Sequence, residues 1–172
     1  MNKRSALIFA VLLTAFALPA RAQTPPTVVI VVRHAEKASS SPQDPDPPLS
    51  EAGAARAQRL KDVAGAAEVA AVYTTQFRRT RDTAAVLGVP VVPVEITRDN
   101  AATYAASVAK EILSKHKGKT VMVVGHSNTT PQMVEALSGR RVPPLDDARD
   151  FDALYVVVIP DAGPPRLVRG KY

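Results

Sequence analysis

The feature that most constrains the fold is an unbroken run of β-branched residues at positions 28–32, Val-Val-Ile-Val-Val. The run shows no alternation of polar and apolar residues, which is the pattern of a strand covered on both faces in a mostly parallel sheet. A second apolar run at residues 120–124 has the same character. Buried strands of this kind need a helical layer on each face of the sheet. We therefore expect a layered α/β protein.

The rest of the chain alternates strand-like and helix-like segments. Further strands are expected at residues 69–74, 91–94, 154–159 and 166–169. The strand at residues 91–94 should lie near a sheet edge, because Pro93 cannot donate a ladder hydrogen bond. Helices are expected from the cap Ser50 to residue 64, at residues 77–87 and 100–117, and from a cap at residue 128 or 129 onward. The alternation predicts a three-layer α/β/α sandwich with a mostly parallel central sheet.

The amino-terminal segment has the features of an export signal. Lys3 and Arg4 precede an apolar stretch at residues 6–20, and residues 20–22 read Ala-Arg-Ala, a small-x-small cleavage pattern. The apolar stretch is shorter than the roughly 20 residues of a bilayer span. We expect residues 1–22 to be removed as a signal peptide and residues 23–172 to form a single domain with no membrane span. The expected location is outside the cytoplasm, in a bacterial periplasm.

Composition excludes several classes of chemistry and partner. The chain has no cysteine, which rules out disulfides, thiolate metal sites and thiol nucleophiles. Its formal charge of +6 falls to +3 when the three basic residues of the export segment are subtracted, and only 5% of the residues are aromatic. A nucleic-acid partner is therefore not expected. A small anionic substrate fits the mild positive charge better.

Polar residues follow three of the expected strands at the point where each strand ends. These residues are Arg33 and His34, Thr75 and Arg79, and His126. The carboxyl ends of parallel strands meet at one edge of a sheet, so we expect two imidazoles and two guanidiniums to share one pocket. Helix N-termini near residues 77 and 128 would face the same pocket, and both features favour a bound phosphate.

Four segments, in this order, resemble the histidine phosphatase (phosphoglycerate mutase-like) superfamily. Residues 33–36, Arg-His-Ala-Glu, resemble its Arg-His-Gly signature, and residues 49–53, Leu-Ser-Glu-Ala-Gly, resemble its Leu-Thr-x-x-Gly helix start. Residues 73–84 resemble its Ser-Ser-Pro-Leu-x-Arg-Ala-x-Gln-Thr-Ala segment, and residues 124–128 resemble its Gly-His segment. The resemblance spans residues 28–172. It departs from the family pattern at Ala35 and at Thr74-Thr75-Gln76.

The resemblance implies a phosphoglycerate mutase-like fold and a phosphatase that needs neither a cofactor nor a metal. It implies that His34 accepts the phosphoryl group, that Arg33 and Arg79 hold the phosphate oxygens, and that His126 is a second phosphate ligand. Nearby guanidiniums should lower the pKa of His34 and keep its attacking nitrogen unprotonated. Water would then hydrolyse the phosphohistidine. The expected substrate is a phosphomonoester or a phosphohistidine, and the expected partner is a phosphorylated small molecule or an envelope glycan.

The group that protonates the leaving atom is less well marked in the sequence. Many members of the family carry a glutamate between the arginine segment and the Gly-His segment, and Glu95 and Asp99 are the candidates here. Glu36, two residues after His34, is a further candidate to orient the site or to donate a proton. The Ser-, Asp- and Pro-rich loop at residues 38–48 is expected to be a linker and not a lid.

Two other classes of function remain open at this stage. One is a catalytically weak phosphate- or glycan-binding module of the same fold, which would form no phosphohistidine. The other is a metal-dependent hydrolase that uses His34, Glu36 and His126 as ligands, since these residue types suit zinc. A serine hydrolase elbow at residues 125–129 is not supported, because no histidine follows Ser127 in the chain.

Overall fold

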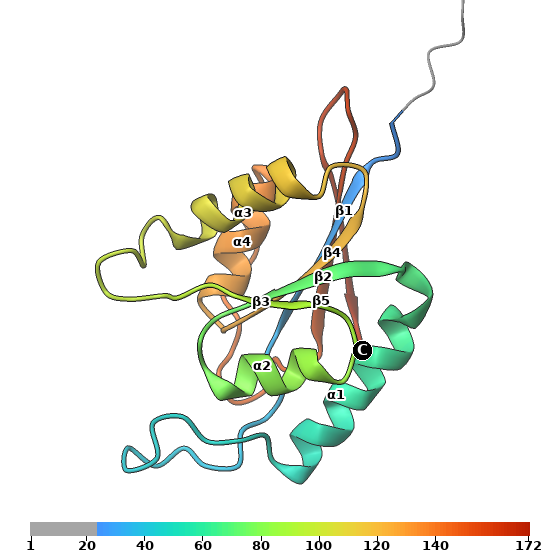
Figure 1. The fold of residues 1–172 in the computed structure, drawn as a ribbon. Helices are drawn as coiled ribbons and strands as arrows, with labels where there is room; N and C mark the ends of the chain where they lie inside the picture. Colours follow the sequence, from blue (N-terminus) through green and yellow to red (C-terminus); the bar gives the residue numbers. More distant parts are fainter. Residues whose placement is uncertain (1–23) are drawn as a thin grey trace, which may run out of the picture.

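A computed structural model describes residues 24–172 of the chain, so the predicted signal peptide at residues 1–22 lies outside the described residues. A six-stranded sheet in the order β3-β2-β4-β1-β5-β6 forms the centre of the molecule (Figure 1). The strands are β1 (Thr27–Arg33), β2 (Val69–Thr74), β3 (Val91–Pro93), β4 (Thr120–Gly125), β5 (Ala153–Ile159) and β6 (Arg166–Lys171).

The sheet is mixed, and most of its strands run in the same direction. Strands β3, β2, β4 and β1 pair in parallel, whereas β5 pairs antiparallel with β1 and β6 pairs antiparallel with β5. The predicted mostly parallel sheet is therefore confirmed, with an antiparallel hairpin added at one edge. The edge position predicted for the strand that contains Pro93 is also confirmed, because β3 is the outermost strand beside β2.

Within residues 24–172, four α-helices cover the sheet: α1 (Glu51–Ala64), α2 (Arg78–Ala85), α3 (Tyr104–Lys115) and α4 (Thr129–Ser138), with a short 3₁₀ turn η1 (Gly65–Ala67) after α1. Ser50 caps α1 as predicted, since its Oγ accepts a hydrogen bond from the Gly53 amide. Helix α3 starts later than predicted. The Asn100 side chain accepts from the amide of Thr97, and its carbonyl accepts from the amides of Thr103 and Tyr104, so residues 97–103 form turns instead of a helix.

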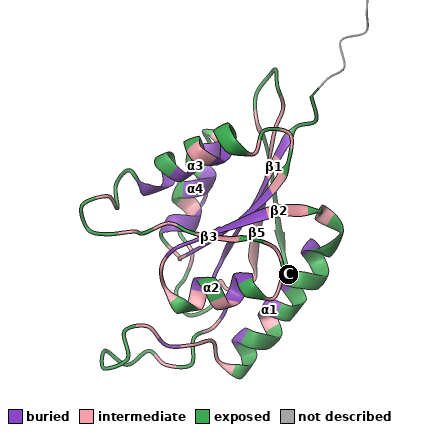
Figure 2. Ribbon diagram, in the orientation of Figure 1, coloured by how far each residue is buried: buried purple, intermediate pink, exposed green. Residues whose placement is uncertain are grey.

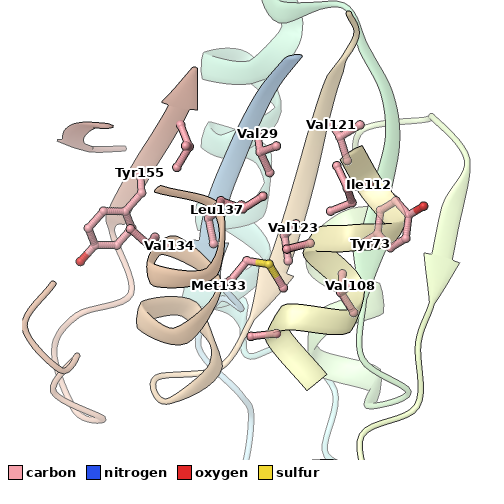
Figure 3. Close-up of a cluster of buried hydrophobic side chains, with 14 of the residues drawn as sticks. Val29, Tyr73, Val108, Ile112, Val121, Val123, Met133, Val134, Leu137 and Tyr155 are labelled. Atoms are coloured by element: carbon pink, nitrogen blue, oxygen red, sulfur yellow. The ribbon is translucent and has the colours of Figure 1, made fainter. Parts of the chain in front are cut away.

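The helices form two layers, one on each face of the sheet (Figures 1 and 2). Helices α3 and α4 cover a core that includes Val29, Val31 and Ile112 (Figure 3), whereas α1 and α2 cover a second core that includes Val32 and Leu60. Successive residues of β1 thus enter opposite cores, which explains why its sequence is apolar without alternation. The three-layer α/β/α fold is confirmed.

Gly53 lies where α1 crosses the segment that follows β1. A Cβ atom at this position would overlap the carbonyl oxygen of Glu36, which itself accepts hydrogen bonds from the amide and hydroxyl of Ser50. Only glycine allows this close approach of helix and loop.

We expect Gly53→Ala to lower the free energy of unfolding by about 1–3 kcal/mol, because the added methyl group must displace backbone. Gly65→Ala, at the C-cap of the same helix, is the matched control, since its Cβ would meet nothing within 4 Å and its φ is −59°. That change should be neutral or stabilising by up to about 1 kcal/mol. Urea unfolding of both variants tests the prediction, which is wrong if Gly53→Ala is as stable as the parent protein.

Candidate active site

A cavity of about 690 Å³ opens at the carboxyl ends of β1, β2 and β4. Its size falls in the usual range for small-molecule sites. It is lined by residues 33–40 in part, by Phe77, Arg79 and Ile96, by residues 126–129, and by residues 147–151 in part. The cavity therefore collects side chains from segments that are far apart in the sequence.

The two histidines at the strand ends lie side by side in this cavity. Their ring centroids are 5.3 Å apart in an edge-to-face arrangement. The cause is the strand register, in which Arg33 of β1 pairs with Gly125 of β4, so that His34 and His126 follow at the same level. The structure thus brings the two imidazoles together as the sequence predicts.

Hydrogen bonding fixes which nitrogen of His34 carries the proton. Nδ1 of His34 lies 2.7 Å from the carbonyl oxygen of Ala35, and a carbonyl oxygen can only accept. Nδ1 is therefore the protonated nitrogen, and Nε2 keeps its lone pair. Ala35 is held in turn by its amide, which donates to Thr83 Oγ1, and Thr83 donates to the carbonyl of Arg79.

Both imidazoles are neutral over the ordinary pH range. Burial is the largest cause, and it acts with the positive charges of Arg33 and Arg79 to lower the pKa of His34 to about 4. Burial also leads for His126, whose pKa is lowered to about 3 with contributions from Arg79, His34 and Arg33. The predicted direction is correct, but burial contributes more than the guanidiniums do.

Arg33 is fixed by the segment at residues 146–151. Its Nη1 and Nη2 atoms donate to the carbonyl oxygens of Asp146 and Asp147, both at 2.9 Å, and Nη2 also lies 3.2 Å from Oδ1 of Asp147. The guanidinium stacks 4.0 Å from the centre of the Phe151 ring. Nε of Arg33 is buried and has no hydrogen-bond partner within residues 24–172. A buried donor without a partner is costly, and because Arg33 lines the cavity, a bound phosphate is the candidate partner for Nε.

Arg79 is braced in a similar way, by a phenylalanine and an aspartate. Its guanidinium lies 4.4 Å from the centre of the Phe77 ring, and Nη1 lies 3.7 Å from Oδ1 of Asp46. The same Asp46 oxygen accepts the amide hydrogen of Arg78 at the start of α2. The loop at residues 38–48 is thus more than a linker, because it contacts an arginine that lines the cavity.

The three carboxylates that the sequence suggested as proton donors are poorly placed to protonate a leaving group. Glu36 lines the cavity, but both of its oxygens accept hydrogen bonds from Arg56 on α1. Burial is the largest single influence on the pKa of Glu36 and raises it, yet the hydrogen bonds and charge of Arg56 act together with a backbone hydrogen bond to lower this pKa below its usual value. Glu95 and Asp99 are exposed and do not line the cavity.

Several contacts of the site were not foreseen from the sequence. They involve Asp46, Arg56, Phe77, Asp147 and Phe151. One signal was present, since Phe77 and Phe151 are the only phenylalanines after residue 16, and both contact an arginine of the cavity.

The ligand set of the metal-hydrolase alternative finds no support in the described part of the chain. No group of three or more His, Asp or Glu residues between positions 24 and 172 is arranged to hold a metal ion. The oxygens of Glu36, one of the three ligands considered, are engaged by Arg56.

Part of the chain matches a known protein family. The sequence model of the histidine phosphatase superfamily (branch 1) matches residues 29–101, which include Arg33, His34 and Arg79. No curated protein matches the chain significantly.

Solved structures share the fold at low sequence identity. The protein histidine phosphatase SixA in complex with tungstate has a TM-score of 0.65 and 16% identity, covering 84% of this chain and 96% of its own. YhfR of Bacillus stearothermophilus has a TM-score of 0.63 and 19% identity, covering 83% and 95%. A mycobacterial glucosyl-3-phosphoglycerate phosphatase in complex with VO3 has a TM-score of 0.56 and 16% identity, covering 82% and 96%.

The matched segment and the shared fold are those of histidine-dependent hydrolases of the phosphatase class. The similarity to the histidine phosphatase superfamily covers residues 29–101, which are 73 of the chain's 172 residues. Within residues 24–172, none of the helices has the length and apolar character that crossing a membrane requires.

The lowered pKa values predict how stability depends on pH. Both imidazoles have a pKa below the unfolded value of about 6.5, so the unfolded chain binds protons first as the pH falls. The free energy of unfolding should therefore decrease from pH 6.5 towards pH 4, by roughly 1.4 kcal/mol per pKa unit for each imidazole at most. Urea unfolding of the parent protein and His126→Asn at pH 7 and pH 4.5 measures the effect. The variant should lose less stability on acidification, and an equal loss in both proteins would contradict the assignment.

Proposed function

We propose that the protein hydrolyses a phosphorylated substrate through a phosphohistidine formed on Nε2 of His34. One observation carries the proposal: two neutral imidazoles and two guanidiniums, Arg33 and Arg79, line a single cavity. Nε2 of His34 has its lone pair free, since Nδ1 holds the proton against the carbonyl of Ala35.

In the first step, the Nε2 lone pair attacks phosphorus, and the bond from phosphorus to the leaving atom breaks with its electron pair going to that atom. The imidazole ring gains positive charge, which the carbonyl oxygen of Ala35 stabilises through the hydrogen bond to Nδ1. Nε of Arg33 and the guanidinium of Arg79 hold the phosphoryl oxygens as their charge shifts. In the second step water attacks phosphorus, and the electron pair of the P–N bond returns to His34.

The arrangement of carboxylates limits the substrate class. Glu36 and Asp147 are the carboxylates that line the cavity, and each is paired with an arginine, Arg56 and Arg33 respectively. A strong proton donor for the leaving atom is therefore lacking among the lining residues. We infer that the leaving group departs with little protonation, as the imidazole of a phosphohistidine or the oxygen of an activated phosphomonoester does. The neighbouring SixA structure is described as a protein histidine phosphatase, which is consistent with this substrate class.

We also propose that the protein acts outside the cytoplasm, because residues 1–22 have the pattern of a cleaved export signal. The substrate would then be a phosphorylated small molecule or an envelope glycan that meets the leaving-group requirement.

Rapid-quench labelling with a ³²P-labelled phosphoramidate tests the intermediate. The parent protein should form an acid-labile phosphohistidine, and His34→Ala should form none and lose at least about 10³-fold in kcat. Activity that survives in His34→Ala would overturn the assignment of the nucleophile. A phosphate-binding module without catalysis would show no labelled protein in either case.

Two adjacent arginines provide a matched test of the phosphate contacts. Arg79 lines the cavity, whereas the exposed Arg78 pairs with Asp82 on the surface of α2. We expect Arg79→Gln to lower kcat/KM by about 10²–10³-fold, because a charge on the transferring phosphoryl group loses its partner. Arg78→Gln should change kcat/KM by less than about threefold, since surface ion pairs contribute little. Equal losses in the two variants would show that general positive charge, and not the position of Arg79, determines activity.

A further inference from the structure

A chain of buried hydroxyl groups lies behind His126. Nε2 of His126 is 2.9 Å from Oγ1 of Thr75, which is 3.0 Å from Oγ1 of Thr80. The Thr80 oxygen is in turn 2.8 Å from the carbonyl oxygen of Phe77 and 3.2 Å from that of Thr75. Both threonines are completely buried, so water does not compete for these hydrogen bonds.

Thr80, at the end of this row of hydroxyl groups, determines the direction of every hydrogen bond in the row. The two carbonyl oxygens beside Thr80 can only accept, so the single hydroxyl hydrogen of Thr80 points to one of them. Thr75 must then donate its own hydrogen to Thr80 Oγ1. Nε2 of His126 must donate to Thr75, because the hydrogen of Thr75 is already used. The reverse direction would leave the Thr80 oxygen facing carbonyl oxygens with no hydrogen between them.

This direction leaves Nδ1 of His126 unprotonated. Nδ1 has no hydrogen-bond partner in the described part of the chain, and it keeps some solvent exposure. His126 lines the cavity beside His34. The two imidazoles therefore hold opposite tautomers, His34 with its proton on Nδ1 and His126 with its proton on Nε2. A neutral Nδ1 accepts hydrogen bonds, so it suits a water molecule or a protonated oxygen better than a phosphate dianion.

We propose that Thr75 and Thr80 are positioning residues that fix this tautomer, and that Nδ1 of His126 is the general base for hydrolysis of the phosphohistidine. The inference rests on the proposed function. Nδ1 takes a proton from water, the water oxygen forms a bond to phosphorus, and the P–N bond breaks with its electron pair returning to Nε2 of His34. The proton on Nδ1 then leaves with the released phosphate or passes to solvent.

The charges around His126 are compatible with this role. Arg79, His34 and Arg33 face it, and together with burial they lower the pKa of His126 to about 3. Nδ1 is therefore unprotonated before the substrate binds. A bound phosphoryl group adds negative charge next to the ring, which opposes the effect of the guanidiniums and makes Nδ1 a stronger base.

Neighbouring threonines at the end of β2, the last strand residue Thr74 and the following Thr75, provide a matched pair of variants. Thr75→Val removes the hydroxyl that accepts from His126, whereas Thr74→Val removes a buried hydroxyl that has no partner among residues 24–172. Thr75→Ser keeps the hydroxyl, and Thr80→Val breaks the next contact in the chain. Urea unfolding identifies the variants that fold, and Thr80→Val replaces Thr75→Val in the comparison if the latter does not fold.

Two measurements are made on each protein. The first is ¹⁵N NMR of labelled histidine side chains, which reports the tautomer of each of the three imidazoles in the chain, with His116→Gln used for assignment. The second is rapid-quench kinetics, which separates formation of the phosphohistidine on His34 from its hydrolysis.

We expect His126 of the parent protein to be the Nε2–H tautomer and Thr75→Val to shift it towards a mixture. Hydrolysis of the phosphohistidine should slow by about 5–10-fold in Thr75→Val, because part of the population then lacks an unprotonated Nδ1, with formation changed by less than about threefold. Thr74→Val and Thr75→Ser should behave like the parent protein.

An Nδ1–H tautomer of His126 in the parent protein would overturn the proposed hydroxyl chain whatever the activity. Unchanged hydrolysis in a folded Thr75→Val or Thr80→Val would overturn the role of His126 as base. If neither the parent protein nor any variant forms a phosphohistidine, the proposed function and its second step are overturned. The NMR result would still decide the direction of the hydrogen bonds between the hydroxyl groups.

Discussion

The site depends on the parallel pairing of β1 with β4, in which Arg33 lies opposite Gly125. This register sends His34 and His126 out of the sheet at the same level, so that their rings meet 5.3 Å apart. A slip of one residue would turn the side chains of β1 to the opposite faces and separate the two imidazoles. Gly125 also contributes, because a Cβ there would lie 2.7 Å from Oγ1 of Thr129 and would push the start of α4 away.

The electrostatic character of the cavity follows from how its arginines are held. Each guanidinium stacks on a phenylalanine and contacts an aspartate of a neighbouring loop, Phe151 and Asp147 for Arg33 and Phe77 and Asp46 for Arg79. Donors that are fixed before the substrate arrives need little reorganisation when charge develops on the phosphoryl group. The same cations act together with burial to keep both imidazoles neutral, which is the state that a nucleophile or base requires.

The sequence was informative where local pattern determines structure. The buried strands, the cap at Ser50 and the meeting of His34 with His126 could be predicted, because apolar runs and strand ends have a direct geometric meaning. The partners of these residues could not. Arg56 reaches Glu36 from another element, and Asp147 and Phe151 reach Arg33 from a segment without regular structure. Such contacts depend on how distant segments pack, and no periodicity in the chain records them.

One tetrahedral anion should bind in the cavity against His34 and the two guanidiniums, and a crystal structure of the protein with tungstate would show its position. We predict that the anion lies against Nε2 of His34 and accepts hydrogen bonds from Nε of Arg33 and from Arg79, with His126 beside it. Tungstate bound elsewhere while this cavity holds only water, or Nε2 of His34 turned away from the anion, would refute the phosphate site described above.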